Sequence, residues 1–512
     1  MIRKILISIL FLSVLLSARY SSAQTFEEYR KRVLAEFDSL KEQQHKNFEE
    51  YRDRINAEYA TMMQQAWEKY NSHTAVQMPH RPEPLHPVIK EPSKKPQEDP
   101  KPGVVEPKLS KPKQDSIKPQ PAIVPNIEPK PEPKVEPKPE PKVEPKPKQK
   151  TPDFKFIFYG MTCSVGMDNS FRFSLSDSNN KTIANAWQRL SNEKSYKLVQ
   201  ELMEKRSLLS LCDWGYVKMI EKLATAYYGN YSNEARLFQI FILVQSGYKV
   251  RIGCCDNKII LMLPFDDPNT TLYGYTYVTK NGMKYYLIDK SLGKGAISLF
   301  DKEFPNERIC SLEIGEQLIL LSKQSNNRTL ISDKYPQMEL SMSTNINLVD
   351  FYNEYPHTDN WSIYVKAPFD SATQSMLYDE LREYIAGKSK SEAANMLLNF
   401  VQTAFQYKTD HQQFGYERPL FCEELFFYPY CDCEDRSILY SKLVRELLGL
   451  DVVLLNYDKH IATAINLGQE IEGDYIDYKG KRYLICDPTY INADIGDAMP
   501  NAGDIIGVIE IQ

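Results

Sequence analysis

The chain has 512 residues, which is more than one hydrophobic core organises and enough for two or three domains. Its net charge of -5 gives no electrostatic case for binding nucleic acid or an anionic membrane. Of the 32 prolines, 22 lie within residues 72–152, so most of them describe a linker and not a fold.

The first 23 residues have the pattern of a secretory signal. Arg3 and Lys4 precede an apolar run at 5–16, and the small residues Ser21-Ser22-Ala23 form a cleavage site. The apolar run is too short to span a bilayer. We therefore expect an exported protein, periplasmic or extracellular, that is cleaved after Ala23 and then keeps no transmembrane segment.

Residues 24–71 predict one long charged helix. Aromatic side chains recur every eleven positions at Phe26, Phe37, Phe48, Tyr59 and Tyr70, and eleven residues make three helical turns. Because a lone helix would leave this stripe in water, we expect it to self-associate as a coiled coil or to dock on the globular part. The alternative is an isolated, marginal helix that its charges keep soluble.

Residues 72–152 form a Pro-, Lys- and Glu-rich segment of low complexity, which is densest from Glu128 onward. Proline removes backbone donors and favours extended polyproline II, and alternating charges keep the segment hydrated. The composition predicts a disordered, semi-rigid spacer. A ligand for proline-binding modules is the alternative, which export disfavours.

From residue 153 the composition becomes aromatic and globular, and the patterns predict an α+β fold. Lys280-Asn281-Gly282 is a hairpin signal. Short alternating runs over 291–360, such as 317–321, predict a small β unit that joins two halves. Helices are expected at 196–203, 217–228, 233–246, 371–385 and 391–405, and strands at 156–160, 249–252, 259–263, 273–279, 284–288 and 361–365.

The stretch Tyr430-Cys-Asp-Cys-Glu-Asp-Arg-Ser437 opens another predicted helix, which apolar residues at helical spacing continue as far as Gly449. Asp432 is well placed as the N-cap, which puts Cys433 in the first turn. The positive end of a helix favours the thiolate, although Glu434 and Asp435 oppose this effect. Strands are expected at 452–455, 460–465, 475–478 and 481–485.

His460 therefore heads a strand, and Asp487 closes a later one. A thiol with an imidazole partner becomes a thiolate–imidazolium pair, and a carboxylate on the far ring nitrogen fixes the tautomer. The sequence thus predicts a catalytic triad of Cys433, His460 and Asp487.

Two alternatives remain beside this triad. Cys433 could be a buried structural cysteine that is unrelated to the other two residues. A metal site could draw on Cys422, Cys431, Cys433, His460 or Cys486, but Cys-X-Cys with scattered ligands is weak zinc spacing. We expect no metal dependence and no cofactor. Glu423, Glu424 and the acids at 494–497 are expected to be solvated charges.

Four pieces of sequence carry a resemblance: Asp432-Cys433-Glu434-Asp435, the helix that ends at Gly449, His460-Ile-Ala, and Tyr483-Leu-Ile-Cys-Asp487-Pro-Thr. With the upstream residues 400–405 and 424–425, the segment 393–489 resembles the transglutaminase-like superfamily of papain-type fold, in its bacterial secreted branch. Cys431 stands where that family usually has glycine, which raises a redox partnership between Cys431 and the nucleophile.

The resemblance implies that Cys433 attacks an amide or peptide carbonyl and forms a thioester. His460 would act as base and then as acid, and Asp487 would orient it. Water resolves the thioester in a peptidase or amidase, and an amine does so in a cross-linking enzyme.

The earlier segment 153–290 repeats the pattern without its chemistry. When Gly247 is aligned with Gly449, Tyr231 falls at the position of Cys433 and Lys258 at that of His460, and Asp289 matches Asp487. Neither a phenol nor an ammonium group can run this reaction. We therefore expect an inactive, duplicated domain that serves packing or substrate binding, with a coincidental arrangement of helices and strands as the alternative.

Together these patterns predict a secreted cysteine hydrolase that acts on protein or peptide substrates, with its catalytic domain at 361–512. A non-catalytic binding or scaffold protein with two transglutaminase-like domains is the alternative from another class. A cross-linking acyltransferase is the third reading.

Overall fold

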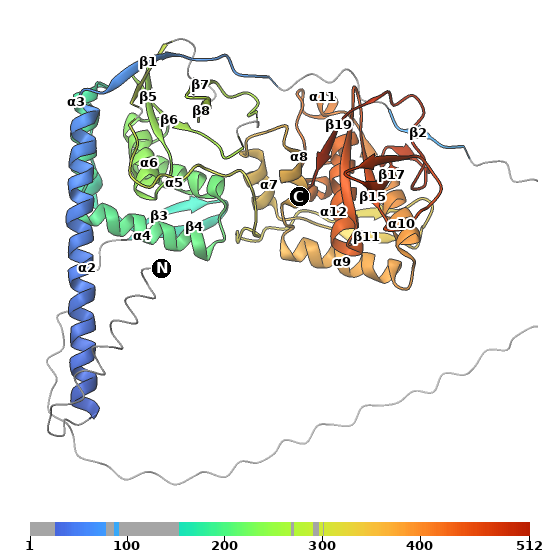
Figure 1. Ribbon diagram of the computed structural model, residues 1–512, viewed down its shortest axis with the longest axis horizontal. Coiled ribbons are helices and arrows are strands. Elements are labelled where there is room, and N and C mark those ends of the chain that lie inside the picture. Colours follow the sequence, from blue (N-terminus) through green and yellow to red (C-terminus); the bar gives the residue numbers. More distant parts are fainter. Residues whose placement is uncertain are drawn as a thin grey trace, which may run out of the picture. The chain divides into compact units, whose positions relative to one another are not determined.

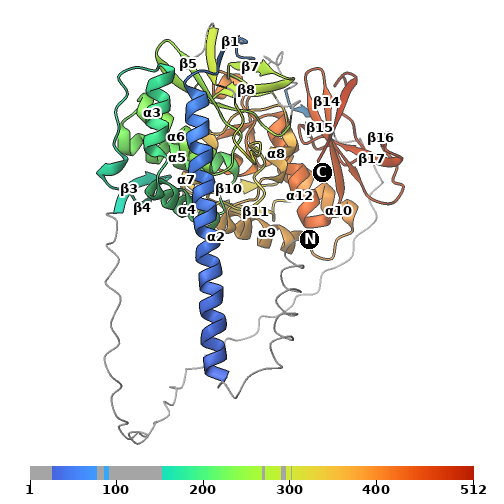
Figure 2. The same cartoon turned by 60° about the vertical axis from the view of Figure 1, so that its left-hand side comes forward.

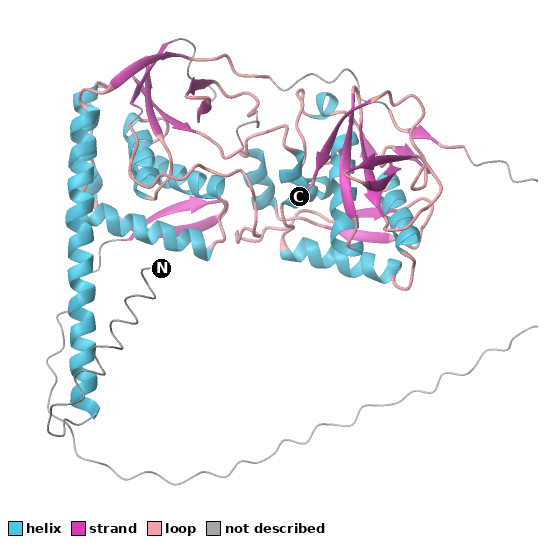
Figure 3. Ribbon diagram, viewed as in Figure 1, coloured by secondary structure: helices cyan, strands magenta, loops and turns pink. Residues whose placement is uncertain are grey.

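The computed structural model describes residues 26–77, 86–91, 153–267, 271–289, 296–300 and 302–511 (Figure 1). The predicted signal sequence and most of the proline-rich segment lie outside these residues. The chain divides into one unit of residues 1–90 and 152–512 and another of residues 91–151. The first unit is mixed α and β, as predicted (Figure 3). A search of the described residues finds no helix that is long and apolar enough to cross a membrane.

The N-terminal helix is present but shorter than predicted. Helix α2 spans Phe26–Met63, and the predicted continuation through Tyr70 is wrong. Trp67–Asn71 instead form strand β1, which pairs antiparallel with β9 (Ala296–Phe300). These residues fit the helical pattern of the sequence, but pairing with the edge strand β9 stabilises them more than another turn of helix would, because the strand provides ladder hydrogen bonds and aromatic contacts.

The last turns of α2 dock on the globular part. Tyr59 is 1% exposed, and its ring lies 5.2 Å from that of Trp187 between centroids. Asn56 is fully buried and accepts a hydrogen bond of 3.0 Å from the Trp187 indole. Figures 1 and 2 show α2 alongside α3 (Asn180–Leu190). The C-terminal end of α2 therefore docks on the globular part, which is one of the two predicted outcomes. Phe48, earlier in the helix, is 59% exposed, and self-association through this part of α2 stays a prediction.

The first half of the globular chain packs helices against an antiparallel sheet of order β1-β9-β5-β6-β8-β7. Asn281 and Gly282, both at positive φ (51° and 77°), close the predicted hairpin between β7 and β8. The elements of this half are β3 (Asp153–Phe158), β4 (Met161–Gly166), α3, α4 (Glu193–Leu208), α5 (Asp213–Tyr228), α6 (Asn233–Gln245), β5 (Arg251–Cys255), β6 (Lys258–Leu263), β7 (Tyr277–Lys280), β8 (Met283–Leu287) and β9.

The region between the halves departs from the predicted β unit. Strand β9 joins the first sheet, and residues 317–321 form no ladder. Strands β10 (Arg328–Ile331) and β11 (Glu339–Met342) make a separate hairpin, and helix α7 (Ile346–Asn353) follows. Trp361–Lys366 form helix α8 where a strand was predicted. That prediction is wrong because a short apolar run looks the same in the sequence whether it forms a buried strand or a buried helix.

The second half repeats the arrangement of helices and sheet. Helix α12 (Cys433–Leu448) ends at Gly449, which adopts the left-handed conformation (φ 61°) as predicted. It packs on strands β14 and β15 of a sheet of order β16-β17-β15-β14-β19. The elements are α9 (Ser371–Ile385), α10 (Lys390–Thr403), β12 (Gln406–Tyr407), α11 (Asp410–Gln413), β13 (Tyr430–Cys431), α12, β14 (Asp451–Tyr457), β15 (Ile461–Asn466), β16 (Tyr475–Tyr478), β17 (Lys481–Cys486), β18 (Tyr490–Ile491) and β19 (Ile505–Glu510).

The two sheets share one strand order. The series β9-β5-β6-β8-β7 corresponds one to one with β19-β14-β15-β17-β16, and every neighbouring pair is antiparallel. In each half one helix, α6 or α12, directly precedes the first hairpin. The two halves thus share one sheet order and one preceding helix, and the duplication itself stays a prediction. The first sheet differs by the addition of β1 at its β9 edge.

A short part of the predicted spacer lies against the second half. Val88–Ile89 form strand β2, which pairs parallel with β18. The Lys90 backbone N–H donates to the Ile491 carbonyl at 2.9 Å, and the Lys90 ammonium pairs with Asp497. The prediction of a disordered spacer is therefore wrong for this piece, because two successive β-branched residues interrupt the proline pattern and pair with β18. Their side chains stay exposed, at 39% for Val88 and 66% for Ile89.

Candidate active site

Cys433 is the first residue of α12 and is fully buried. Its thiol donates a hydrogen bond of 3.2 Å to Oε2 of Glu434. Asp432 occupies the N-cap position, as predicted. Its Oδ2 accepts the backbone N–H of Asp410 (3.3 Å), and its own backbone N–H donates to Oδ2 of Asp435 in the first turn (3.3 Å). The sulfur thus lies at the positive end of a 16-residue helix.

His460 and Asp487 meet at the edge of two neighbouring strands. His460 directly precedes β15, and Asp487 directly follows β17, its antiparallel neighbour. The His460 Nε2 and Asp487 Oδ2 atoms are 2.7 Å apart, and both side chains are buried. Asp487 Oδ1 also accepts the backbone N–H groups of Thr489 (2.8 Å) and Tyr490 (3.2 Å). The carboxylate is therefore fixed by the chain itself and can hold the imidazole in one orientation.

The start of α12 lies against this pair. Ser437 lies one turn after Cys433 on the same face of α12. Its hydroxyl donates a hydrogen bond of 3.1 Å to the carbonyl of Ile461, the residue that follows His460. Arg436 donates to the carbonyl of Pro488, the residue that follows Asp487. The structure thus gathers the three predicted site residues in one buried neighbourhood.

One predicted contact is not formed. His460 Nδ1 has no hydrogen-bond partner among the described residues, so the thiol of Cys433 does not meet it in this conformation. The imidazole therefore has one nitrogen held by Asp487 and one left for a proton. A thiol that rotated from Glu434 toward Nδ1 would complete the acid–base pair that thiol catalysis uses.

Five buried carboxylates surround the start of α12, and two of them, Asp410 and Glu417, were missed in the sequence. Ligand oxygens of Asp410, Asp432 and Asp435 lie within 4.8 Å of one another, as do those of Asp410, Glu417 and Glu434. Burial, and then the neighbouring carboxylates, raise the pKa of Asp410 and Asp432 well above the usual range and that of Asp435 to about 8. Like charges this close cannot all ionise without a compensating cation.

The prediction that Glu423 and Glu424 are solvated is wrong, since both are buried. Glu424 pairs with Arg418, which is also buried. Glu423 accepts hydrogen bonds from the hydroxyls of Thr344 (2.9 Å) and Thr373 (2.6 Å). These partners come from distant parts of the chain, so no local pattern in the sequence could have shown them.

The other cysteines form no second centre. All nine are free thiols, and Cys431 Sγ contacts the Gln406 carbonyl at 3.9 Å. Cys422 and Cys486 likewise contact separate backbone carbonyls, so these sulfurs do not converge as a zinc site would require. Burial raises the pKa of Cys431 to about 11 and those of Cys422 and Cys486 to about 12.

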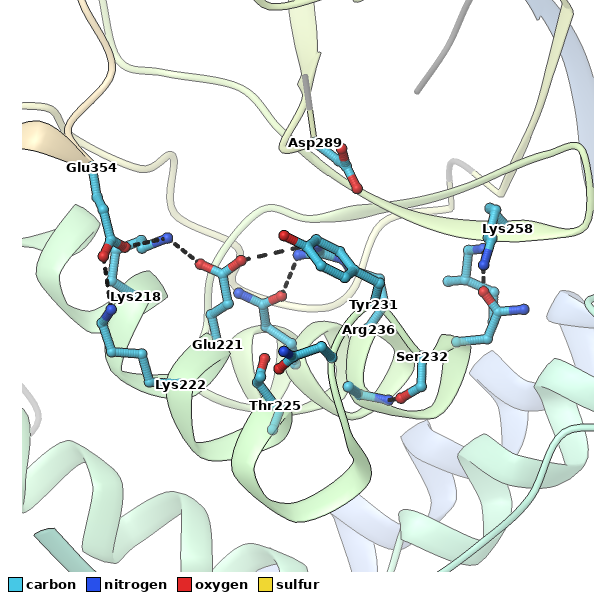
Figure 4. A pocket seen from close by; sticks show the side chains of 16 residues that line it. Lys218, Glu221, Lys222, Thr225, Tyr231, Ser232, Arg236, Lys258, Asp289 and Glu354 are labelled. Atoms are coloured by element: carbon cyan, nitrogen blue, oxygen red, sulfur yellow. Dashed lines mark hydrogen bonds and ion pairs between the residues drawn. The ribbon is translucent and has the colours of Figure 1, made fainter. Parts of the chain in front are cut away.

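The corresponding positions of the first half line one pocket. Tyr231, Lys258 and Asp289 border a cavity of about 350 Å³ at the start of α6. Figure 4 shows Asp289 extending toward Tyr231 from the opposite wall, with Lys258 to one side. Tyr231 is 82% exposed, in contrast to the buried Cys433. The sequence alignment of the two halves thus identified three residues that the fold brings together.

Ion pairs complete the floor of this pocket. Glu354 lies 2.8 Å from the ammonium groups of both Lys218 and Lys222, and Lys218 also pairs with Glu221 (Figure 4). No thiol or imidazole is among the residues that line the pocket. The charged side chains that line it, among them Lys218, Glu221 and Arg236, can bind a ligand through ion pairs and hydrogen bonds.

Comparison with known proteins returns no matching family model, no matching curated protein and no matching solved structure.

Proposed function

We propose that this chain is an exported cysteine hydrolase of the transglutaminase-like type, a peptidase or amidase whose catalytic residues are Cys433, His460 and Asp487. One observation carries the proposal. A buried imidazole is held by a carboxylate on Nε2 (2.7 Å) and has a vacant Nδ1, beside a helix that begins at a cysteine. This combination is the one that converts a thiol into a nucleophile.

The proposed reaction begins when the thiol of Cys433 turns from Glu434 to His460 and gives its proton to Nδ1. The thiolate adds to the carbonyl carbon of an amide bond, and the imidazolium donates its proton to the leaving amine as the carbon–nitrogen bond breaks. Water then attacks the thioester and gives a proton to His460. The carboxylic acid product leaves and gives its own proton to solvent, and the sulfur recovers its proton from the imidazolium. Asp487 keeps the imidazole oriented throughout.

A specific observation favours a second candidate, a non-catalytic binding protein. Cys433, His460 and Asp487 are 0%, 0% and 1% exposed, whereas the pocket of the first half is open and charged. In that reading the first half holds a ligand and the buried triad only supports the fold. In the hydrolase reading, the first half serves substrate binding.

Thiol labelling of the full chain separates the two candidates. Burial raises the pKa of each of the other eight cysteines, so these thiols should stay protonated and slow near neutral pH. We expect iodoacetamide at pH 7 to alkylate Cys433 first, as mapped by peptide mass spectrometry. His460→Ala should slow this reaction by about 10²-fold or more.

Cys431→Ser is the matched control, because it removes a buried thiol two residues away and leaves the triad unchanged. It should keep the wild-type rate at Cys433. Uniform labelling of all cysteines, or a rate at Cys433 that does not depend on His460, would leave the binding candidate in place of the hydrolase.

A further inference from the structure

Two short parallel strands bring distant acids together beside Cys433. Strands β12 and β13 pair in register, Gln406 with Tyr430 and Tyr407 with Cys431. Asp410 follows the end of β12, and Asp432 directly follows the end of β13. Because the two strands are parallel, both carboxylates lie beyond the same end of the pair. The backbone N–H of Asp410 then donates to Asp432 Oδ2 at 3.3 Å.

Asp435 joins this pair from the first turn of α12. Its Oδ1 accepts the backbone N–H of Leu420 (2.8 Å), and its Oδ2 accepts that of Asp432 (3.3 Å). Each carboxylate oxygen has two lone pairs, so both oxygens can still bind a further partner. Oδ2 of Asp410 accepts the backbone N–H of Arg418 at 2.6 Å. Backbone groups therefore hold all three carboxylates in fixed positions, which is the preorganisation that a ligand site needs.

Two oxygen atoms in this cluster lack a partner. Asp410 Oδ1 and Asp432 Oδ1 are buried and accept no hydrogen bond, although each residue is only 1% exposed. Among the residues that the structure describes, no lysine or arginine forms an ion pair with either. Arg418 pairs with Glu424, and Arg436 donates to backbone carbonyls. Buried carboxylate oxygens without any partner are costly, so something should meet them.

We propose that Asp410, Asp432 and Asp435 form a calcium-binding site at the start of α12. Calcium binds carboxylate oxygens at about 2.4 Å, so two oxygens on opposite sides of one ion are about 4.8 Å apart. The ligand oxygens of the three residues lie within that same limit of 4.8 Å. Glu417 and Glu434, whose oxygens lie equally close to Asp410, can extend the coordination toward the six to eight oxygens that calcium takes.

The donor set selects the class of cation. Carboxylate oxygens suit hard cations such as calcium, whereas a cysteine sulfur suits soft ones. The Cys433 sulfur lies within 4.8 Å of ligand oxygens of Asp432 and Glu434, but the proposed site uses the carboxylates alone. This inference revises the expectation from the sequence that the protein has no metal dependence. It does not depend on the chemistry of Cys433, and Cys433→Ser should bind calcium as the wild-type chain does.

Binding is tested on the full chain after removal of metals with EDTA. Calcium should raise the melting temperature, and isothermal titration calorimetry should show one site per chain. Terbium, a calcium substitute, should give luminescence on excitation of tyrosine, and calcium should displace it. Asp410→Asn and Asp432→Asn each remove one charge without a change of shape, so each should weaken calcium binding at least tenfold.

Glu423→Gln is the matched control, because Glu423 is equally buried in the same half but lies outside the cluster and has its own hydrogen bonds. It should bind calcium like the wild-type chain. If Asp410→Asn does not fold, Asp432→Asn supplies the same comparison. The proposal is overturned if the wild-type chain shows neither a shift nor luminescence at millimolar calcium or terbium, if it responds only to magnesium, or if both cluster variants bind with wild-type affinity.

Discussion

Replacing Asp487 with asparagine tests the proposed triad at its most constrained point. Oδ1 of Asp487 accepts two backbone N–H groups, at 2.8 Å from Thr489 and 3.2 Å from Tyr490. An asparagine carbonyl oxygen can keep both bonds, so its amide nitrogen must face His460 Nε2 and donate to it. That donation places the imidazole proton on Nδ1, the nitrogen that has to receive the thiol proton.

The size of the effect follows from the burial of this pair. His460 and Asp487 are 0% and 1% exposed, so bulk water cannot replace the lost base, and a positioned base contributes about 10²- to 10⁴-fold to a proton-transfer step. Asp487→Asn should therefore slow alkylation of Cys433 by about 10²- to 10⁴-fold, which is about 3–5 kcal/mol at about 1.36 kcal/mol per factor of ten. The measurement is the rate of iodoacetamide labelling at pH 7, followed by mass spectrometry of the peptide that contains Cys433.

Folding must be measured in parallel, because one charge-assisted hydrogen bond is also lost from the native state. We expect a cost of about 1.5–3 kcal/mol in denaturant unfolding, which leaves the variant folded at 25 °C. Asp494→Asn is the matched control, since that carboxylate pairs with Lys334 on the surface and should change neither quantity. A folded Asp487→Asn that reacts at the wild-type rate would refute the role of Asp487 in activating the thiol.

Two further predictions concern stability. Burial raises the pKa of Glu423 from 4.5 to about 7, so the folded state holds this proton while the unfolded state has lost it. Stability should therefore fall as pH rises from about 4.5 to 7, by about 3 kcal/mol from this group, and Glu423→Gln should lack that slope. Denaturant unfolding of both proteins at several pH values measures it, and a pH-independent difference between them would contradict the assignment. Tyr59→Ala should cost about 3–5 kcal/mol because the ring is buried, whereas Tyr51→Ala, at 43% exposure on the same helix, should stay within about 0.5 kcal/mol. Equal costs for the two tyrosine variants would contradict the docked position of α2.

The sequence was informative wherever the signal is local. The start of α12 at Cys433 and its end at Gly449 follow from a cap position, helical spacing and one glycine, all within the helix itself. His460 and Asp487 were found because they stand at the ends of strands that turns and alternation delimit. In each case the residues that decide the structure are neighbours in the sequence.

Three errors arose where distant residues decide. Trp67–Asn71 leave the helical pattern because β9, more than 200 residues later, offers them a sheet edge. Asp410 reaches Asp432 only through two-residue strands that no periodicity can reveal. Glu423 is buried because threonines about 50 and 79 positions away supply its hydrogen bonds. Tertiary partners override local preference in all three cases.

The two halves separate what the fold provides from what the residues provide. Both place one residue at the start of a helix and two at the ends of neighbouring strands, in sheets of the same order. In one half those positions hold Cys433, His460 and Asp487 and are closed to solvent, and in the other they hold Tyr231, Lys258 and Asp289 around an open cavity. Since the same scaffold supports both, the chemistry depends on the side chains and not on the architecture. The half that keeps the opening but not the thiol is suited to holding a ligand, which leaves the reaction that we propose to the half that begins its helix with a cysteine.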